Sequence, residues 1–550
     1  MKDYARNSSR IRLLLSLVTG VLIISIVILA FTPPISRDAL IHHLAIPKLY
    51  LKHGGIYEIP FMAFSYYPMN LNLLYMIPLF MGNDIVPKYI HFIFALLTAW
   101  LIYRYLRRRL NSIYGLLGAV FFLSIPIIVK LSITAYVDLG VVFFSTASLL
   151  LLLRWIETRF PMRYLILSGI FCGLAVGTKY NGLIALLLLT LFIPYLYSRC
   201  AQQGEPRFFK AVGFGVIFLM VALAVFSPWM IRNYVWTHNP VFPLYDHWFN
   251  PQGGYSRASM GLFTVRSVMY HENWWQIALL PVRVFFQGQD GNPQYFDGKL
   301  NAFLLLLPLV VLYQIRGGSR IIRTEKGILF AFAGLFFLFA LFTSTLRMRY
   351  IAPIIPPLVI LSVFGIESLS RVAANFARPI SRAIGKGAVL VIVLCLLWLN
   401  ANYIFDQYRE VRPFHYLGGR LTRDEYIETY RPEYPVMQYI NTNLPPDVRI
   451  LFIFMGNRGY YCEREYIFDM SKNKSMFQQF VKLSTTTEEL LLRLQSLGIT
   501  HLLVYYDIFD RWMKDAFTVE EQGFLKRFFQ IHVKHLYVKN GYGISRLEAP

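Results

Sequence analysis

Long apolar runs, separated by short segments rich in arginine and lysine, dominate the chain. A helix of about 20 apolar residues spans the hydrocarbon core of a bilayer. Eleven runs fit such a span, at residues 11–32, 86–106, 113–131, 138–156, 164–178, 180–198, 208–230, 301–314, 327–345, 350–369 and 388–403. This pattern predicts an α-helical polytopic membrane protein with about eleven transmembrane helices.

The basic residues give the predicted helices an orientation. The second run ends in Arg104, Arg107, Arg108 and Arg109, and comparable clusters recur at every other connection. Lysine and arginine in short loops mark the cytoplasmic side. An odd number of spans then places the N-terminus in the cytoplasm and the C-terminus outside. The first run lacks a small-residue cleavage site, so we expect a retained span and not a removed signal peptide.

Two polar segments interrupt the pattern on the outer side, at residues 33–70 and 232–300. The first is crowded with ionisable side chains that a simple connection between spans does not need. The apolar run that follows it, residues 71–82, is too short to cross a bilayer. We expect that run to form a half-helix that dips into the membrane interface.

The composition becomes that of a soluble protein from about residue 407. We expect helices at residues 435–444 and 486–497, and strands at 449–455 and 501–506. Residues 529–538 and 542–547 flank an Asn-Gly pair, which is a strong hairpin signal. The chain therefore divides into a membrane domain, residues 1–405, and a small extracytoplasmic α/β domain, residues 406–550.

Composition supports the membrane assignment. Hydrophobic residues make up 56% of the chain and charged residues 15%, whereas soluble proteins have about a quarter charged residues. The formal net charge of +23 comes mostly from the short loops, and no basic patch interleaved with aromatics points to nucleic acid. The four cysteines form no CxxC pair, which argues against a metal cluster or an obvious disulfide.

Several ionisable residues lie at the outer ends of the predicted spans, where burial costs a few kcal/mol each. They are Asp38, Asp138, Lys179, Arg232, Arg347 and Arg349. The four cations run against the rule that keeps basic residues on the cytoplasmic side. Together they suit an anionic substrate such as a lipid phosphate, and a nearby carboxylate can serve as a general base on a hydroxyl.

Each candidate also has a structural interpretation. Asp38 and Asp138 can cap the helices that begin beside them, and the cations can extend to the interface as headgroup anchors. For three further residues, packing and substrate contact are both open at this point. They are His42, His43 and the interfacial aromatic Tyr67.

At these positions the sequence resembles the GT-C superfamily of integral membrane glycosyltransferases, in particular the protein O-mannosyltransferase and aminoarabinose transferase group. The resemblance covers residues 11–369. It is carried by Asp38 in the first outer loop, Tyr67-Pro68 before the short helix, Asp138 at the start of the fourth span, residues 173–179, residues 228–244 and Arg349-Tyr350…Pro353.

The resemblance implies transfer of a sugar from a polyprenyl-phosphate donor to a lipid, glycan or protein acceptor, with inversion, on the outer face of a bacterial inner membrane. Asp38 would be the general base and Asp138 a second catalytic acid. Lys179, Arg232 or Arg349 would stabilise the departing phosphate. Many relatives have Asp-Glu where this chain has Asp38-Ala39, so we expect no metal cofactor.

Two other functions are compatible with parts of the pattern. A transporter or flippase for a lipid-linked or anionic substrate would also be polytopic, but transporters show inverted repeats and charges at the bilayer midplane. Neither feature is visible in this sequence. A related GT-C enzyme that moves a whole oligosaccharide to protein is the third possibility.

Overall fold

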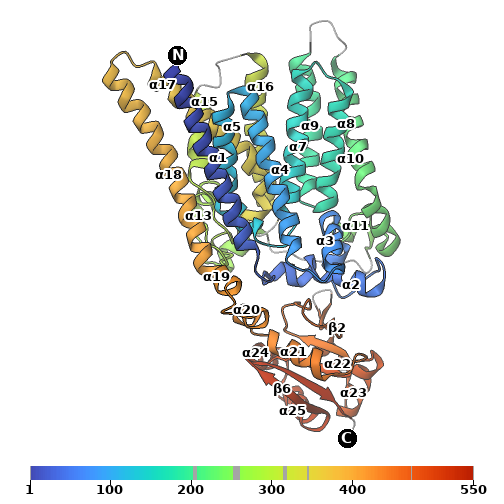
Figure 1. Cartoon of the computed structure of the whole chain (residues 1–550). Coiled ribbons are helices and arrows are strands. Elements are labelled where there is room, and N and C mark those ends of the chain that lie inside the picture. Colours follow the sequence, from blue (N-terminus) through green and yellow to red (C-terminus); the bar gives the residue numbers. More distant parts are fainter. Residues whose placement is uncertain are drawn as a thin grey trace.

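The computed structural model describes residues 2–201, 207–251, 261–313, 319–343, 346–471 and 474–548. Its larger part is a bundle of long helices, and a small α/β domain lies beyond one end of that bundle (Figure 1). Within these ranges, eight helices are long and apolar enough to cross a membrane, or nine if one bent pair forms a single span. The predicted helical membrane fold is therefore confirmed.

The long helices match the predicted spans in order. They are α1 (Lys2–Ala30), α4 (Val86–Arg109), α7 (Asp138–Glu157), α9 (Gly182–Cys200), α10 (Arg207–Thr237), α16 (Arg320–Thr343), α17 (Ile355–Ala374) with the preceding 3₁₀ turn η4 (Met348–Ile354), and α18 (Pro379–Val411). Of the other three predicted spans, two are the shorter helices α8 (Met162–Thr178) and α15 (Phe303–Tyr313), and the third is a bent pair of helices. The total of eleven spans stays a prediction.

The bent pair consists of α5 (Ser112–Ser124) and α6 (Pro126–Ser132), which meet at an angle of 67°. Ile125 between them has an extended backbone, with ψ of 131°. A residue before proline is driven out of the helical region by a clash with the proline ring. Pro126 therefore explains the bend between α5 and α6.

The two chain ends lie at opposite ends of the bundle. The N-terminus lies at one end, whereas the first loop, with α2 (Ala45–His53) and α3 (Asn70–Phe80), lies at the other end, next to the C-terminal domain (Figure 1). The predicted half-helix at residues 71–82 is thus α3, with 11 residues. This arrangement agrees with the odd number of crossings predicted from the basic clusters.

Two stretches of irregular structure cover the end of the bundle that faces the C-terminal domain. The first loop contains η1 (Ala39–His43) before α2 and η2 (Ala63–Tyr66) before α3. The long loop between α10 and α15 contains α11 (Asp246–Phe249), α12 (Leu262–Thr264), η3 (Val265–Met269), α13 (Trp274–Ala278) and α14 (Leu280–Arg283). Both were predicted as outer loops.

The C-terminal domain is a five-stranded sheet with strand order β2-β1-β5-β7-β6. Its strands are β1 (Arg449–Ile453), β2 (Glu465–Phe468), β5 (His501–Tyr505), β6 (Val533–Lys539) and β7 (Tyr542–Leu547). β1 pairs in parallel with β2 and β5, whereas β7 is antiparallel to β5 and β6. The predicted hairpin exists, but residues 529–532 are helical because α25 (Val519–His532) continues to the start of β6.

Helices surround this sheet and join it to the bundle. They are α19 (Pro413–Leu417), α20 (Arg423–Tyr430), α21 (Tyr434–Asn443), α22 (Met476–Leu483), α23 (Thr487–Ser496) and α24 (Tyr506–Ala516), together with α25, and a two-stranded ribbon is formed by β3 (Met470–Ser471) and β4 (Lys474–Ser475). The predicted domain boundary at residue 405 falls inside α18.

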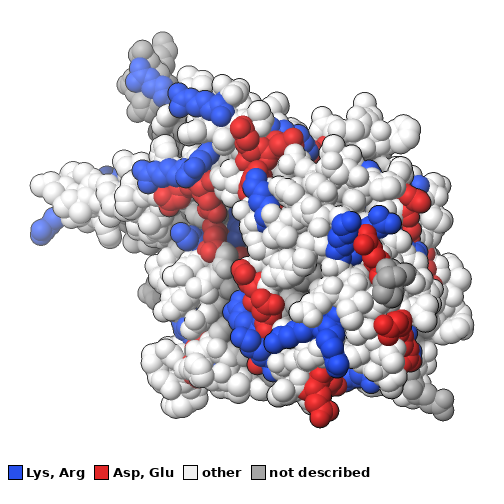
Figure 2. Space-filling view, turned by 90° about the horizontal axis from the view of Figure 1, so that it is seen from below, with Lys and Arg blue, Asp and Glu red and all other residues white. Residues whose placement is uncertain are grey.

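The two faces of the sheet belong to different cores. Leu451 and Ile453 face α22 to α25. Ile450 and Phe452, on the opposite face, belong to the same continuous core as the membrane helices. The surface seen from this end of the molecule carries interspersed positive and negative side chains and no broad basic patch (Figure 2).

Candidate functional site

Asp38 is the last residue before η1, in the position of a helix cap. Its side chain forms no capping hydrogen bond. The carboxylate instead forms an ion pair with the guanidinium of Arg349, which η4 brings to the same place. The capping interpretation of the Asp38 side chain is therefore wrong, and two residues that are 311 positions apart in the sequence form one partly buried pair.

Aromatic rings enclose the Arg349 guanidinium. It lies 5.1 Å from the ring centre of Tyr136 and 5.2 Å from that of Tyr350. Cations are attracted to the faces of aromatic rings, most strongly where water is excluded. Arg349, in η4, is thus held against the connection between α6 and α7, which contains Tyr136. Its Nε is buried and has no hydrogen-bond partner.

Asp138 and Lys179 form a second ion pair. Asp138 is the first residue of α7, and its Oδ1 accepts a hydrogen bond of 2.7 Å from Lys179 Nζ. Lys179 ends α8 at a sharp connection to α9, which was predicted as an outer hinge. Gly182 makes this connection possible, since a Cβ there would lie 2.6 Å from the Ala175 backbone.

Tyr350 connects the two ion pairs. The Lys179 ammonium lies 5.0 Å from the centre of the ring that also faces Arg349. The pairs Asp38–Arg349 and Asp138–Lys179 therefore form one cluster at the bundle end nearest the C-terminal domain. Sequence reasoning placed all four charged residues on one membrane face, and the structure brings them together.

The electrostatic state of the first-loop residues follows from this cluster. Burial raises the pKa of Asp38, but the Arg349 guanidinium, together with His42 and Lys179, outweighs burial and lowers the pKa of Asp38 to about 2. Burial lowers the pKa of His42 to about 4, against the opposing attraction of Asp38. At neutral pH Asp38 is a carboxylate and His42 a neutral imidazole.

The two predicted histidines have different surroundings. His42 stacks on Phe64 with ring centres 4.3 Å apart, and its Nδ1 is buried without a partner. His43 Nδ1 lies 3.1 Å from the Asn72 amide, which also donates to the His43 carbonyl. His43 therefore joins η1 to α3, as expected for a packing residue, and its ring also lies 5.5 Å from that of Tyr136. Tyr67 packs edge-on against Phe64.

The structure assigns different contacts to the remaining predicted cations. Arg232 donates to the carbonyls of Tyr66 and Tyr67, and its guanidinium lies between the rings of Trp229 and Trp236. Arg232 thus holds the first loop. Arg347 Nη1 lies 3.8 Å from Asp297 of the long loop. Neither residue has a described contact with Asp38 or Asp138.

Some residues of the cluster were not predicted as site residues. Tyr136 and Tyr350 supply the aromatic faces, and both stand beside residues that were singled out. His91 lies within α4, where its Nε2 accepts from the Leu139 backbone at 2.9 Å. An ionisable residue inside an apolar span is a signal in itself, and this one supports the helix turn that carries Asp138.

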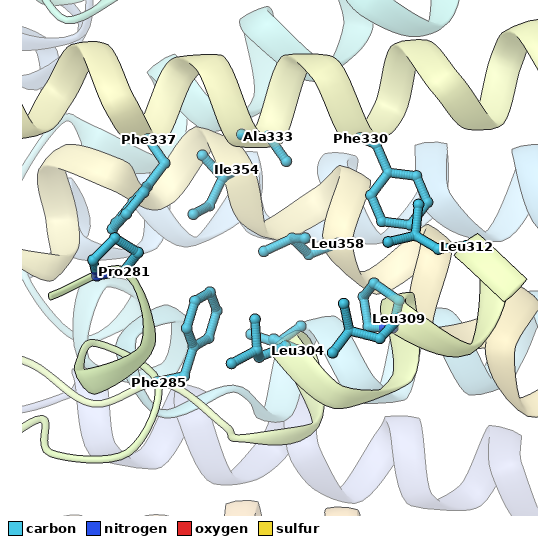
Figure 3. A pocket seen from close by; sticks show the side chains of 13 residues that line it. Pro281, Phe285, Leu304, Leu309, Leu312, Phe330, Ala333, Phe337, Ile354 and Leu358 are labelled. Carbon is cyan, nitrogen blue, oxygen red and sulfur yellow. The ribbon is translucent and has the colours of Figure 1, made fainter. Parts of the chain in front are cut away.

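An apolar cavity of about 230 Å³ lies between α14, α15, α16 and the start of α17. Every lining residue is apolar, including Phe285, Leu304, Phe337, Ile354 and Leu358 (Figure 3). Ile354 is the last residue of η4, and Arg349 is the second residue of the same turn. At about 2 Å rise per residue in a 3₁₀ helix, Arg349 lies roughly 10 Å along the backbone from this cavity.

No group of three or more histidine, cysteine or acidic side chains within the described ranges could hold a metal ion. The metal independence expected from Asp38-Ala39 stays a prediction.

Comparisons with known proteins place this geometry in context. The model of the family described as dolichyl-phosphate-mannose-protein mannosyltransferase matches residues 71–231, the segment with Asp138 and Lys179. No curated protein matches the sequence significantly.

Solved structures match nearly the whole chain. The apo structure of ArnT from Cupriavidus metallidurans has a TM-score of 0.56 at 14% identity, covering 98% of both chains. The same protein bound to undecaprenyl phosphate gives 0.55 at 14% identity, covering 97% of both. The archaeal oligosaccharyltransferase AglB from Archaeoglobus fulgidus, with an inhibitory peptide and a dolichol-phosphate, gives 0.51 at 12%, covering 96% of this chain and 74% of AglB.

The family match confirms the predicted resemblance to protein mannosyltransferases over residues 71–231, and the structural matches confirm the predicted fold, which this chain shares with ArnT and AglB. They also extend beyond the predicted range of residues 11–369, because 98% of this chain is covered by ArnT. The C-terminal domain is thus part of the shared architecture.

Proposed function

We propose that this protein is a membrane glycosyltransferase that moves a sugar from a polyprenyl-phosphate donor to an acceptor outside the cytoplasm. The observation that carries the proposal is the charge cluster of Asp38, Arg349, Asp138 and Lys179 at one end of the bundle. The ArnT structure matched here was also solved bound to undecaprenyl phosphate, a ligand of the same chemical class.

The donor has two parts, and the site offers surroundings suited to each. Its phosphate would meet the guanidinium of Arg349 and the ammonium of Lys179, which form strong charge-assisted hydrogen bonds to phosphate oxygens. Its prenyl chain would stay in apolar surroundings, and the cavity that begins at Ile354 is lined only by apolar residues. The short length of η4 between Arg349 and Ile354 suits a molecule with a charged head and an apolar tail.

The reaction then has one nucleophilic step. The acceptor oxygen attacks the anomeric carbon as Asp38 takes the hydroxyl proton. The bond between that carbon and the phosphate oxygen breaks, with inversion, and the electron pair leaves with polyprenyl phosphate. Arg349 and Lys179 stabilise the charge that develops on the departing phosphate.

Donor binding would also prepare the base. Asp38 paired with Arg349 is a weak base, since its pKa lies at about 2. A phosphate that engages Arg349 competes with the carboxylate for the same guanidinium. The pKa of Asp38 would rise in that complex because its burial persists, and a raised pKa strengthens a carboxylate as a general base. We therefore expect the donor to bind before the acceptor.

The basic clusters at the other end of the bundle indicate which side of the membrane the site faces. Lysine and arginine favour the cytoplasmic side, so the cluster of Asp38 and Lys179 would face outward in a bacterial inner membrane. The acceptor is then a lipid, glycan or protein in the extracytoplasmic space.

A transfer assay tests the proposal against the transporter alternative. Purified protein in proteoliposomes would receive polyprenyl phosphate carrying labelled mannose or labelled aminoarabinose, together with lipid, glycan or peptide acceptors. We expect covalently extended acceptor and free polyprenyl phosphate in equal amounts. Movement of intact labelled donor between leaflets, with no product from any acceptor, would contradict the proposal.

A further inference from the structure

Four consecutive backbone carbonyls lead from the end of α1 towards Asp38, and side chains from distant parts of the chain bind all of them. The segment contains Pro33 and Pro34, whose rings fix φ and remove the backbone donors. The buried Lys88 of α4 donates to the carbonyl of Thr32 at 2.7 Å and to that of Pro33 at 3.3 Å. The membrane domain itself therefore holds the first half of the segment.

The C-terminal domain holds the second half. The hydroxyl of Tyr461 donates to the carbonyl of Pro34 at 2.7 Å. The guanidinium of Arg431 donates to the carbonyl of Ile35 through both Nε and Nη2. The next carbonyl, Ser36, accepts from the Leu40 amide at the start of η1. The contacts from the C-terminal domain thus end at Ile35, three residues before Asp38.

The domain that supplies these donors is itself fixed on the bundle. Arg423 forms an ion pair with Asp84, just before α4, and Tyr460 donates to the same carboxylate at 3.2 Å. Lys48 of α2 forms an ion pair of 2.6 Å with Glu463.

Apolar contacts add to this attachment. Phe61 of the first loop packs edge-on against Tyr466 and Phe468 of β2, and one core runs through both domains. Arg431 and Tyr461 therefore hold a defined position relative to the charge cluster.

We propose that Arg431 and Tyr461 are positioning residues, through which the C-terminal domain holds the Asp38 carboxylate in place for catalysis. This inference rests on the proposed function. A general base must lie within hydrogen-bond reach of the proton it takes, and a displacement of about 1 Å can cost roughly 100-fold in rate. Among the described contacts, neither residue touches Lys179 or Arg349, so we expect donor binding not to depend on them directly.

The test compares hydrogen-bond deletions in the full chain. Tyr461→Phe removes one hydroxyl, and Arg431→Gln removes the guanidinium, whereas Arg431→Lys keeps the charge. Two matched controls lie inside the C-terminal domain. Arg464→Gln removes a guanidinium that binds the carbonyls of Leu444 and Asn441, and Tyr434→Phe removes a hydroxyl that binds Asp424 at 2.7 Å.

We expect Arg431→Gln and Tyr461→Phe to lower kcat by about tenfold or more, by misplacing the base, with the donor KM within about twofold of wild type. Arg431→Lys should recover part of the loss, and both controls should keep wild-type kcat. A loss in Arg464→Gln or Tyr434→Phe as large as in the test variants would overturn the inference, because the effect would then be general to the domain.

A second readout does not depend on transfer. Amide hydrogen exchange of the peptide that covers residues 36–44 should accelerate in Arg431→Gln and Tyr461→Phe but not in the controls. Exchange equal to wild type in both test variants would overturn the positioning role even if the wild-type enzyme transfers sugar. Absence of transfer by the wild type, with faster exchange in the variants, would instead contradict only the proposed function.

Discussion

The two ends of the helix bundle both contain buried ion pairs, but the pairs differ in kind. At the end near the N-terminus, Glu157 binds Arg108, Arg109 and Arg154, and Glu325 binds Arg109 and the Tyr105 hydroxyl. These residues join the ends of α4, α7 and α16. Each carboxylate has two or more donors, so this cluster is largely saturated.

The cluster at the other end retains unused polar atoms. Among the buried side-chain atoms of the described residues, Asp138 Oδ2 and Arg349 Nε of this cluster and His42 Nδ1 of the adjoining first loop have no partner, whereas the opposite cluster has only Arg109 Nε in this state. An unsatisfied buried polar atom costs about 1–3 kcal/mol. Such a cost, carried by several groups together at a membrane edge, agrees with the proposed donor site, whereas saturated pairs agree with a structural connection.

Among the variants at the two ends of the bundle, Asp38→Asn should lower transfer most strongly. Without a general base, kcat of the folded protein should fall by about 100-fold to 10,000-fold, while the variant is still expressed, with an unfolding temperature lowered by the loss of the partner of Arg349. The measurement is transfer in proteoliposomes at saturating donor. Near-normal turnover by the variant would exclude Asp38 as the base.

Arg349→Gln should lower transfer by about 100-fold, as expected when one donor to a developing anion is removed. It should also change the pH dependence. Arg349 holds the pKa of Asp38 at about 2, and without it burial raises that pKa. The acid limb of kcat/KM, which reports the free enzyme, should therefore move to higher pH in the variant. An unchanged acid limb would show that Asp38 is not the titrating group.

The same pair contributes to stability in a defined pH range. Because the pKa of Asp38 is depressed in the folded protein, its contribution is present above the unfolded value of about 4 and is lost as the pH falls towards 2.

Lys179→Gln should have a smaller effect, mainly on binding of the donor. The variant keeps Asp38 and Arg349, so we expect a donor KM raised by about tenfold, the effect of roughly one charge-assisted hydrogen bond. Asp138 also loses its partner in this variant. A donor KM and kcat that both equal wild type would remove Lys179 from the site.

Glu325→Gln, at the opposite end, should leave transfer unchanged in the folded protein. Removing one partner from a buried ion pair typically costs about 3–5 kcal/mol, so the measurable effect is a lower unfolding temperature. A selective loss of transfer with unchanged stability would contradict the structural role of this cluster and the contrast between the two ends.

The sequence predicted the long helices well because the bilayer restricts what can cross it. A span needs a fixed length of apolar residues, and basic residues mark one side. These rules located α4, α7, α9 and α10 and placed Asp38 and Lys179 on one face. They also located α8 and α15, but the lengths of these helices, 17 and 11 residues, fall below the usual span, so their crossing of the membrane stays a prediction.

Pairing inside the site was beyond sequence reasoning. Asp38 and Arg349 come from segments far apart in the chain, and only the resemblance of Arg349-Tyr350…Pro353 to a family motif distinguishes Arg349 from Arg347, two positions earlier. The side that each residue presents depends on η4, a 3₁₀ turn whose period is 3.0 residues, and not on the α-helical period used to read the sequence. The contacts of Arg431 and Tyr461 with the first loop could not be predicted from the sequence either, because they depend on how the two domains pack.

Binding of polyprenyl phosphate tests the central claim most directly, because the claim is that Arg349 and Lys179 recognise a lipid-linked phosphate. Native mass spectrometry of the purified protein with polyprenyl phosphate, and with the matching polyprenol, separates recognition of the head from recognition of the tail. We expect the wild type and Glu325→Gln to prefer the phosphate, and the double variant Lys179→Gln/Arg349→Gln to bind both lipids equally weakly. Full retention of the preference for phosphate in the double variant would contradict the account.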